Sequence, residues 1–262
     1  MLPLDDSPIT RDGKLLILAM DHGLEHGPVD FKEVPESLDP STVFETARHD
    51  AVTAMAVQKG VAEAYYPSYA DDVNLLVKLN GTSNLWMGEP DSPVNCSVDY
   101  AVELGADAVG FTVYSGSNHE VEMFEEFRDI QETARDYGIP VVMWSYPRGQ
   151  GLKNDTKPSV ISYAARIALE IGADVAKVKY PGSAAAMEHA VDAAGKTKVV
   201  MSGGSKTSDE SFLRSVQDVI DAGGAGLAVG RNVWQRDDPE RMLDYLEEVI
   251  YAEQSVDDVL SS

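Results

Sequence analysis

The stretch "EIGADVAKVKYPG" (residues 170–182) joins the end of a helix to an apolar strand through Gly172 and a turn of small residues. The same pattern recurs in "ELGADAV" (103–109) and "DAGGAGLAV" (221–229). In each copy glycine ends the helix and an apolar run follows at once. A repeated helix-to-strand unit predicts strands and helices that alternate around a parallel sheet.

Outward from these units, apolar strand-like runs alternate with amphipathic helical patterns along the chain. We predict strands over residues 14–20, 54–58, 84–88, 106–114, 139–146, 173–180, 198–203 and 225–230. We predict helices over residues 41–50, 98–104, 119–137, 157–171, 184–194, 208–222 and 239–252. Eight such units in 262 residues fit an α/β fold of the (β/α)8 TIM-barrel type better than a doubly wound sheet. Since no composition break marks a second domain, we expect a single domain over residues 1–262.

The charge is the unusual feature of the composition. Asp and Glu number 44 against 21 Lys and Arg, which gives a formal net charge of −23, while 44% of residues are hydrophobic. A surface of this sign repels nucleic acid and anionic membranes, so we expect neither as a partner. The acidic residues are spread over predicted helix faces, which indicates a solvated coat of the kind that suits concentrated salt rather than an acidic docking surface.

The chain also lacks the usual signals for export or membrane insertion. No stretch approaches the ~18 consecutive apolar residues of a membrane span, and "MLPLDDSPITRDG" at the start lacks the basic and apolar regions of a signal peptide. One cysteine, Cys96, excludes an internal disulfide and a cysteine-based metal cluster. We therefore expect a cytoplasmic protein.

Polar side chains follow several predicted strands at the end where barrels place their chemistry. Residues two apart on a strand share a face, so each of three strand ends presents its polar groups on one side. These groups are Trp144, Tyr146 and Arg148 after the fifth strand, Lys177 and Lys179 on the sixth, and Asp21, which continues the face of Leu15, Ile17 and Ala19. If these faces point inward, they meet at one mouth.

A lysine in the middle of a strand is the strongest of these signals. An ammonium group is costly to bury among Val and Ala, and burial favours the free amine, a nucleophile for carbonyl carbon. The alternative is an edge strand whose lysines extend to solvent. The position of "GADVAKVKY" as sixth of eight repeats disfavours that alternative, although strand alternation does not choose between Lys177 and Lys179.

Two glycine-rich segments, "MSGGSK" (201–206) and "VGRN" (229–232), end the seventh and eighth strands. Barrels commonly bind phosphate there through backbone N–H groups, and Arg231 adds a fixed charge. The alternative is a pair of ordinary turns that use glycine for tight geometry. Positive groups gathered in so acidic a chain favour the phosphate interpretation.

The stretch "AMDHGLEHGPVD" (19–30) contains H-x-x-E-H, with His22 and His26 spaced for a zinc site on a helix. Gly23 and Gly27 weaken a helix and Pro28 ends it, so we predict a loop. A glycine-rich turn with surface histidines is one alternative, and a zinc hydrolase built on these histidines is another.

Taken in order, "MDHGLEHGP", "WSYPRG", "GADVAKVKY", "MSGG" and "VGRN" resemble the archaeal-type class I fructose-bisphosphate aldolases, Schiff-base-forming enzymes of the DeoC/FbaB-like group. The match runs from about residue 12 to the last predicted strand. It implies reversible cleavage of fructose 1,6-bisphosphate to dihydroxyacetone phosphate and glyceraldehyde 3-phosphate in glycolysis and gluconeogenesis, by a homo-oligomer. It implies no metal and no cofactor, because a protonated imine replaces the Lewis acid.

The resemblance also implies individual roles. Lys177 forms the Schiff base, Tyr146 is the proton donor and acceptor for the cleaved bond, Asp21 assists proton transfer and Trp144 shapes the pocket. The C1 phosphate is held by Ser202, Gly203, Gly204, Gly230 and Arg231. The rest of the sugar bisphosphate is contacted by His22, His26, Asp30, Arg148 and Lys179.

Two other functions share parts of this pattern. A sister enzyme, 2-amino-3,7-dideoxy-D-threo-hept-6-ulosonate synthase, has the same fold and the same imine lysine, and a few loop residues separate such specificities. A non-catalytic phosphosugar-binding barrel retains the phosphate glycines. It has no need of a buried lysine beside a tyrosine.

Overall fold

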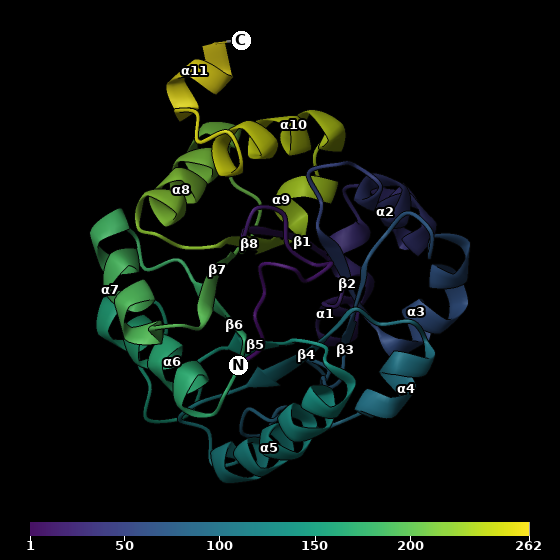
Figure 1. The fold of residues 1–262 in the computed structure, drawn as a ribbon, viewed down its shortest axis with the longest axis vertical. Coiled ribbons are helices and arrows are strands. Elements are labelled where there is room, and N and C mark those ends of the chain that lie inside the picture. Colours follow the sequence, from purple (N-terminus) through teal and green to yellow (C-terminus); the bar gives the residue numbers. More distant parts are fainter. Residues whose placement is uncertain (262) are drawn as a thin grey trace.

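The structure, a computed structural model, describes residues 1–261 and shows a closed barrel of parallel strands. Figure 1 looks into this barrel, with the helices around it. Each strand pairs with the next in the chain, and the last pairs with the first, which confirms the α/β TIM barrel. The strands are β1 (Leu15–Ala19), β2 (Ala54–Gln58), β3 (Leu75–Lys78), β4 (Ala108–Val113), β5 (Val141–Ser145), β6 (Val175–Lys179), β7 (Lys198–Ser202) and β8 (Gly226–Val229).

Each predicted helix range holds a helix of the outer ring. These are α2 (Pro40–Ala47), α4 (Val98–Glu103), α5 (Glu120–Tyr137), α6 (Pro158–Glu170), α7 (Ala184–Ala194), α8 (Asp209–Asp221) and α10 (Pro239–Ile250). The sequence did not predict α3 (Lys59–Tyr65), nor the short helices α1 (Gly23–His26), α9 (Arg231–Trp234) and α11 (Val256–Ser261). Three 3-10 turns complete the order, at Gly27–Phe31, Pro35–Leu38 and Tyr66–Ser68. Within residues 1–261 no helix combines the length and apolar character that crossing a membrane requires.

Side-chain caps fix where several of these helices begin. Ser183 accepts a hydrogen bond from the third residue of α7, and Ser208 does the same for α8. Asp238 caps α10, whose first residue is proline. Such caps satisfy backbone donors that a helix leaves free and so place each βα connection precisely enough to shape a site.

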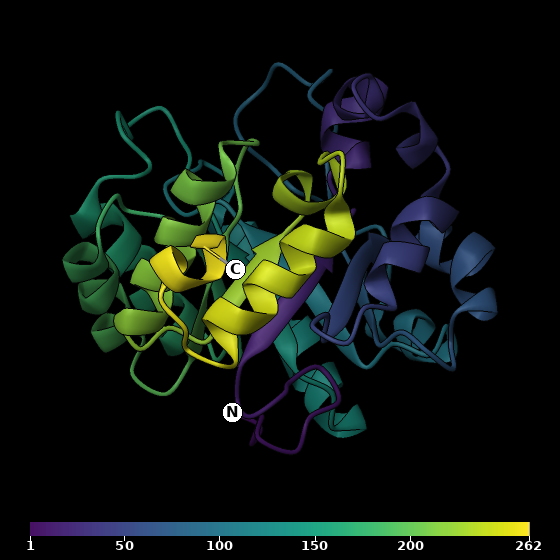
Figure 2. The same cartoon turned by 90° about the horizontal axis from the view of Figure 1, so that it is seen from above.

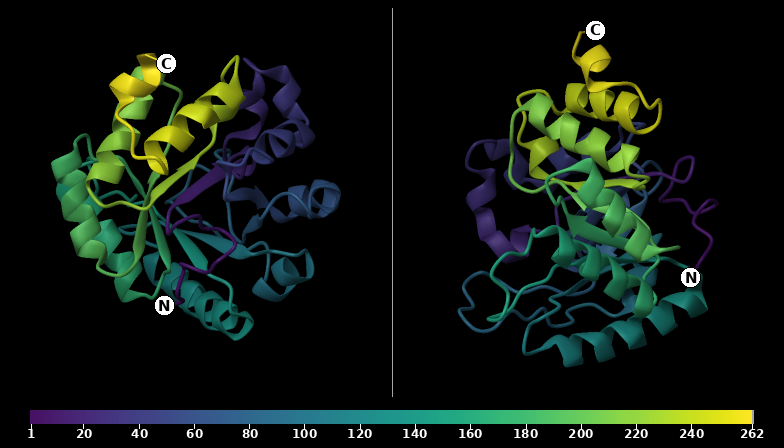
Figure 3. Two further views of the ribbon diagram at one scale, coloured as in Figure 1. Left: turned by 45° about the horizontal axis from the view of Figure 1, so that its top comes forward. Right: turned by 90° about the vertical axis from the view of Figure 1, so that its left-hand side faces the viewer.

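The apolar core has two layers, one between the strands and the helices and one inside the barrel. The inner layer is formed by alternate residues of the strands, including Ile17, Val142, Val175 and Val200. The N-terminal segment closes the amino end of the barrel, where Leu4 and Ile9 join the inner layer and the Leu2 N–H donates to buried Asp174 over 2.7 Å. Figure 2 shows this segment at the bottom of the barrel. The carboxyl ends of the strands lie at the opposite end of the barrel, and Figure 3 shows the ring of helices around the strands from two further directions.

The predicted third strand was wrong. Residues 84–88 lie in a turn-rich connection, where Leu85 and Met87 are 91% and 92% exposed, and the true strand is β3, which is buried throughout. The residues 84–88 are apolar, but glycine and proline around them leave no extended backbone to pair with a neighbour. In contrast, Leu75 pairs directly with Met55 of β2.

The loop predicted over residues 19–30 is also corrected, because its centre forms the single helical turn α1. The His26 N–H donates to the His22 carbonyl over 2.8 Å and closes this turn. Gly27 then ends it at φ +67°, and Pro28 begins a 3-10 turn. The glycine and proline therefore limit the helix to one turn rather than preventing it.

Candidate active site

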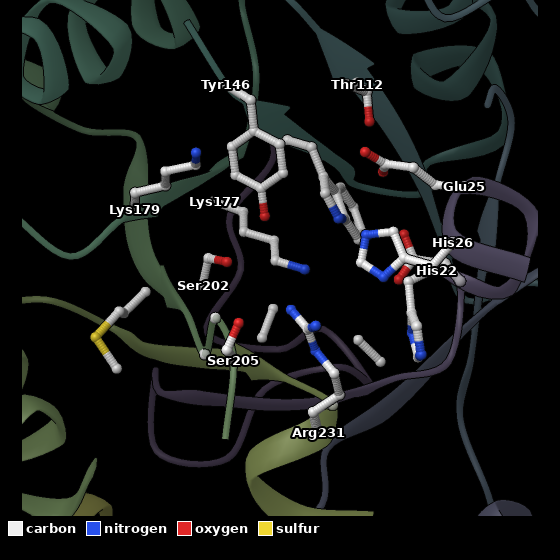
Figure 4. Close-up of a pocket in the computed structure, with 18 of the residues that line it drawn as sticks. His22, Glu25, His26, Thr112, Tyr146, Lys177, Lys179, Ser202, Ser205 and Arg231 are labelled. Carbon is white, nitrogen blue, oxygen red and sulfur yellow. The ribbon is translucent and has the colours of Figure 1, made fainter. Parts of the chain in front are cut away.

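A pocket with a cavity volume of about 630 Å³ opens at the carboxyl end of the barrel and is lined by residues from every strand or the residue after it. The volume lies in the usual range for small-molecule sites. Of the predicted site residues, all but Asp30 line this pocket. Asp30 lies behind it, against a neighbouring depression that it shares with Arg231. Figure 4 shows ten labelled residues around the pocket.

Lys177 lies on the inner face of β6 and is only 5% exposed. Its Nζ lies 4.5 Å from the centroid of the Trp144 ring, on the strand that pairs with it. Burial lowers the pKa of this amine, and the negative charges of Asp21 and Glu25 oppose that shift. The free amine is therefore more accessible at neutral pH than for an exposed lysine, as a nucleophile requires.

Lys179 has a different environment, because it lies two residues further along β6 and nearer the rim of the pocket. Its side chain is 28% exposed and its Nζ forms an ion pair with Asp155. In Figure 4 the Lys177 amine points into the centre of the pocket, whereas the Lys179 amine points away from it. The depth of the two amines, which strand alternation could not supply, favours Lys177 as the imine lysine.

Tyr146 extends from the end of β5 with its hydroxyl directed toward Lys177 and Ser202 (Figure 4). Burial raises the pKa of this phenol, and a hydrogen bond with Ser202 acts in the opposite direction. The hydroxyl is therefore protonated at neutral pH. It is positioned as a proton donor for an oxygen bound above Lys177.

Lys78, on β3, is a site residue that the sequence reasoning missed. It is 3% exposed and lines the pocket, with its Nζ 5.3 Å from the centroid of the Trp144 ring. Burial lowers its pKa to about 8; Asp21 opposes this shift and Lys177 adds to it. Inward alternation with Leu76 would have revealed it, but the third strand had been placed elsewhere.

Asn80 holds the Lys78 amine in place. Lys78 Nζ donates to the Asn80 carbonyl over 3.0 Å and to Asn80 Oδ1 over 2.8 Å. The Asn80 amide in turn donates to the carbonyls of Ser92 and Thr112, each over 2.8 Å, and Oδ1 accepts from the Thr112 N–H. Because this fully buried amide is bonded on all sides, the amine has a fixed position.

The ends of β7 and β8 form the glycine-rich side of the pocket. Gly204 adopts φ +64°, a backbone conformation that favours glycine. Asn232, fully buried in α9, donates to the carbonyls of Gly203 over 2.7 Å and Ser205 over 2.9 Å. These bonds hold the loop against α9 beside Arg231, as an anion site built from backbone N–H groups requires.

The histidines of α1 form a cluster around one carboxylate. Asp30 Oδ2 lies 2.6 Å from His26 Nδ1 and 3.7 Å from His22 Nε2. The His22 ring stacks on the Trp234 ring, with 5.3 Å between the ring centroids. Burial lowers the pKa of His22. Burial alone would raise the pKa of Asp30, but the His26 hydrogen bond and Arg231 bring it below its ordinary value. Within the described chain, no group of three or more His, Cys, Asp or Glu side chains has the arrangement of a metal site.

The two arginines at the mouth of the pocket, Arg148 and Arg231, are each ion-paired with a carboxylate. Arg148 donates to Glu25 over 3.0 Å and also lies over the Tyr114 ring. Arg231 lies 3.5 Å from Asp30. Glu25, a residue for which the sequence suggested only zinc chemistry, is thus part of the pocket wall as a counter-ion.

Residues 15–236 match the DeoC/LacD family aldolase sequence family. The chain belongs to this aldolase family. It is 73% identical over 260 residues to a class 1 fructose-bisphosphate aldolase of Halobacterium salinarum, covering 99% of both chains. It is 34% identical over 254 residues to 2-amino-3,7-dideoxy-D-threo-hept-6-ulosonate synthase 1 of Archaeoglobus fulgidus, covering 97% of this chain and 92% of the relative.

Solved structures give the same family. One is an archaeal fructose-1,6-bisphosphate aldolase with its catalytic lysine covalently bound to the carbinolamine intermediate of the substrate. It matches this aldolase with a TM-score of 0.88 and 49% identity, over 91% of this chain and 94% of the other.

Proposed function

We propose that the pocket at the carboxyl end of the barrel is the active site and that Lys177 is its imine-forming lysine. The chain is a class I, Schiff-base-forming fructose-1,6-bisphosphate aldolase, which cleaves its substrate reversibly to dihydroxyacetone phosphate and glyceraldehyde 3-phosphate. The observation that carries the assignment is the position of the Lys177 amine, buried beside Trp144 inside the barrel. Lys179, its neighbour on the same face, is already paired with Asp155.

Cleavage begins when the free amine of Lys177 attacks the C2 carbonyl of the open-chain sugar. The carbinolamine loses water and leaves a protonated imine, which serves as an electron sink. The C4 hydroxyl then gives up its proton as the C3–C4 bond breaks, so C4 becomes the aldehyde of the departing triose and the bond electrons form an enamine. Protonation at C3 and hydrolysis of the imine release dihydroxyacetone phosphate and restore the amine.

Tyr146 is the group we assign to the proton of the C4 oxygen. In cleavage its protonated hydroxyl first gives its proton to the carbinolamine hydroxyl that leaves as water, and the resulting phenolate then accepts the proton of the C4 hydroxyl. In the direction of bond formation the same proton returns to the C4 oxygen. Asp21, whose charge acts on both Lys177 and Tyr146, assists these transfers. Lys78 adds a positive charge beside the same Trp144 ring, where it stabilises oxygens that gain negative charge.

The two phosphates of the substrate are assigned to opposite sides of the pocket. Ser202, Gly203, Gly204, Gly230 and Arg231 bind the C1 phosphate, supported by the Asn232 hydrogen bonds that hold this loop. Arg148, Lys179, His22 and His26 contact the rest of the sugar bisphosphate, and Asp30, behind the pocket, holds His26 through a hydrogen bond. The Trp144 ring lies beside both buried amines and shapes the pocket between these sides.

The alternative functions have less support. The identity to the heptulosonate synthase is 34%, less than half the value for the Halobacterium aldolase. A non-catalytic sugar-binding barrel does not need two buried lysines against one tryptophan. A zinc hydrolase would need a third ligand beside His22 and His26, and Asp30 instead bonds to one histidine and orients the other.

We also propose that the enzyme acts in the cytoplasm as a single-domain chain that assembles into a homo-oligomer. The family assignment supports the location, since sugar phosphates are charged metabolites of that compartment, and the chain matches relatives along almost its full length. Light scattering on the purified protein measures the assembly directly. A monomeric mass would contradict the oligomer.

Trapping with borohydride tests the role of Lys177. Borohydride added with dihydroxyacetone phosphate should leave one covalent adduct per chain on the peptide that contains Lys177. Replacing Tyr146 with Phe removes only the hydroxyl and should slow cleavage of fructose 1,6-bisphosphate by ~10²–10⁴-fold, while trapping persists. Lys177→Ala should lose both activities.

The control for this experiment is Lys179→Met, which should still be trapped. An adduct that maps to Lys179, or near-normal cleavage by Tyr146→Phe, would show that the roles are assigned wrongly. Offering fructose 1,6-bisphosphate alone and measuring triose phosphates separates the aldolase from the heptulosonate synthase.

A further inference from the structure

The connection between β5 and α6 places an acidic residue against Lys179, which lines the pocket. Asp155 accepts a hydrogen bond from Lys179 Nζ, and Arg148 lies close enough for its charge to stabilise the same carboxylate. The hydrogen bond from Lys179 and the charge of Arg148 hold the pKa of Asp155 below its ordinary value. Asp155 is thus paired with Lys179, while Arg148, which bonds to Glu25, acts on it only through its charge.

A carboxylate and a phosphate make the same charge-assisted hydrogen bonds with lysine and arginine. The place taken by Asp155, within reach of Lys179 and Arg148, is therefore one that a phosphate of the substrate would also take. The substrate carries two phosphates, and the glycine-rich loop accounts for only one of them. Asp155 and the second phosphate consequently compete for the same cations.

We propose that Asp155 is a specificity-determining residue whose carboxylate occupies the subsite of the second phosphate until a phosphate dianion displaces it. This inference rests on the proposed assignment of the pocket as the aldolase active site. Weakly bound anions do not displace a carboxylate that is ion-paired with Lys179, whereas a phosphate ester with two negative charges does. The residue therefore selects for a bisphosphate and against small anions.

The segment around Asp155 is free to move when the carboxylate is displaced. In the part of the chain that the structure describes, hydrogen bonds of residues 152–156 other than the one from Lys179 stay within the connection itself. Leu152 bonds back to Gly149, and Asn154 accepts from Thr156. The ion pair with Lys179 is thus the polar contact that ties this segment to the barrel.

Selection against small anions has a clear use in a chain of net charge −23. Such a chain suits concentrated salt, where an unpaired Lys179 would attract chloride in competition with substrate. An internal carboxylate is always present at the site and limits that competition. It also keeps the partly buried Lys179 paired when no substrate is bound, as Glu25 does for Arg148.

Asp155→Asn tests the proposal, with inorganic sulfate as the probe at constant ionic strength. The substitution removes the competing charge and should tighten sulfate binding by about fivefold in titration calorimetry. The double variant Asp155→Asn/Lys179→Met should lose this gain, which locates it at the pair. Glu247→Gln is the matched control, because it removes one negative charge from the ion pair with Arg11 on the opposite face of the barrel.

Kinetics give a second readout. Asp155→Asn should lower the KM for fructose 1,6-bisphosphate more than the KM for fructose 1-phosphate, which lacks the second phosphate. Unchanged sulfate affinity, or an equal shift of both KM values, would overturn the proposal. If wild-type protein fails to cleave the bisphosphate while Asp155→Asn still tightens sulfate binding, the anion subsite stands and the proposed active site fails.

Discussion

Trp144 lies beside two amines, those of Lys78 and Lys177, whose pKa values are lowered by burial. Its ring centroid lies 4.5 Å from Lys177 Nζ and 5.3 Å from Lys78 Nζ. An aromatic face attracts a cation, so the ring stabilises whichever amine is charged. Asn80 supplies two hydrogen-bond acceptors to the Lys78 amine, which favours its charged form. In residues 1–261 no side chain makes such hydrogen bonds to the amine of Lys177, which we propose as the nucleophile.

Lys78→Met should raise stability at neutral pH and lower the rate of cleavage. A folded pKa of about 8 against an ordinary 10.5 means that the charge costs about 3 kcal/mol of stability at pH 7. Between these pKa values the folded state binds fewer protons than the unfolded state, so this cost disappears as pH rises from 8 to 10.5. Urea unfolding at pH 7 and at pH 10 measures the stability of wild type and variant, and an assay of triose phosphate release measures the rate of cleavage.

In this comparison the stability difference between variant and wild type should shrink with rising pH. A constant difference would show that folding does not lower the pKa of Lys78. Retained cleavage would show that its charge is not used in the reaction.

At the scale of the element, the strands that the sequence predicted correctly are those whose apolar run is bounded by clear turns. In β6, alternation placed Val175 and Lys177 on one face, and both point into the barrel. The strand β3 was missed because it is only four residues long and ends in a lysine, while a longer-looking apolar run follows at residues 84–88. Its pairing with β2, a contact between distant residues, is what the local pattern does not contain.

The candidate site was predictable to the same extent. Strand ends that follow a correctly placed strand supplied Tyr146, Lys177 and Ser202. Lys78 was lost with its strand, and Asp155 was lost because a carboxylate in a long connection carries no periodic signal. Residues that bind through tertiary contacts, such as Asn232, need the fold before their role is visible.

Gly110→Ala should disturb the site through packing alone. Gly110 faces the barrel interior from β4, and a Cβ there would lie 2.5 Å from Trp144 Cζ3 and 2.9 Å from Leu76 Cδ2. The indole must shift to make room, at a cost of about 1–3 kcal/mol in stability. We expect lower kcat and a changed tryptophan fluorescence.

Gly60→Ala is the control for this prediction, because no atom lies within 4 Å of its added Cβ. It should leave both kcat and fluorescence unchanged. A Gly110→Ala enzyme with normal kcat would mean that the exact position of the indole does not matter for catalysis.

At the scale of the whole molecule, the two ends of the barrel differ: the amino end is closed by apolar packing, and the carboxyl end holds the pocket. The N-terminal segment fills the amino end with Leu4 and Ile9 and is held by Asp174, which also bonds to Arg135 over 2.9 Å. The carboxyl end carries the cations, in a chain whose surface is otherwise strongly acidic. A field of this form repels anions from most of the surface, so the ion pairs at the mouth decide which anions bind.

The net charge of −23 predicts that stability rises with salt. Exposed pairs such as Arg166–Glu170 and Arg214–Glu210 offset little of the repulsion, since a surface ion pair contributes roughly 0–1 kcal/mol. The screening length falls from ~10 Å at ~0.1 M to ~3 Å at ~1 M salt, so repulsion between neighbouring carboxylates should fade over that range. We expect Tm to rise steadily with KCl.

The triple variant Glu122→Gln/Glu125→Gln/Glu132→Gln, on the exposed face of α5, should show a shallower rise, because less repulsion remains to be screened. A wild-type Tm that stays flat from 0.1 M to molar KCl would contradict the charge argument, and equal slopes for the two proteins would assign the rise to a general effect of salt on apolar burial.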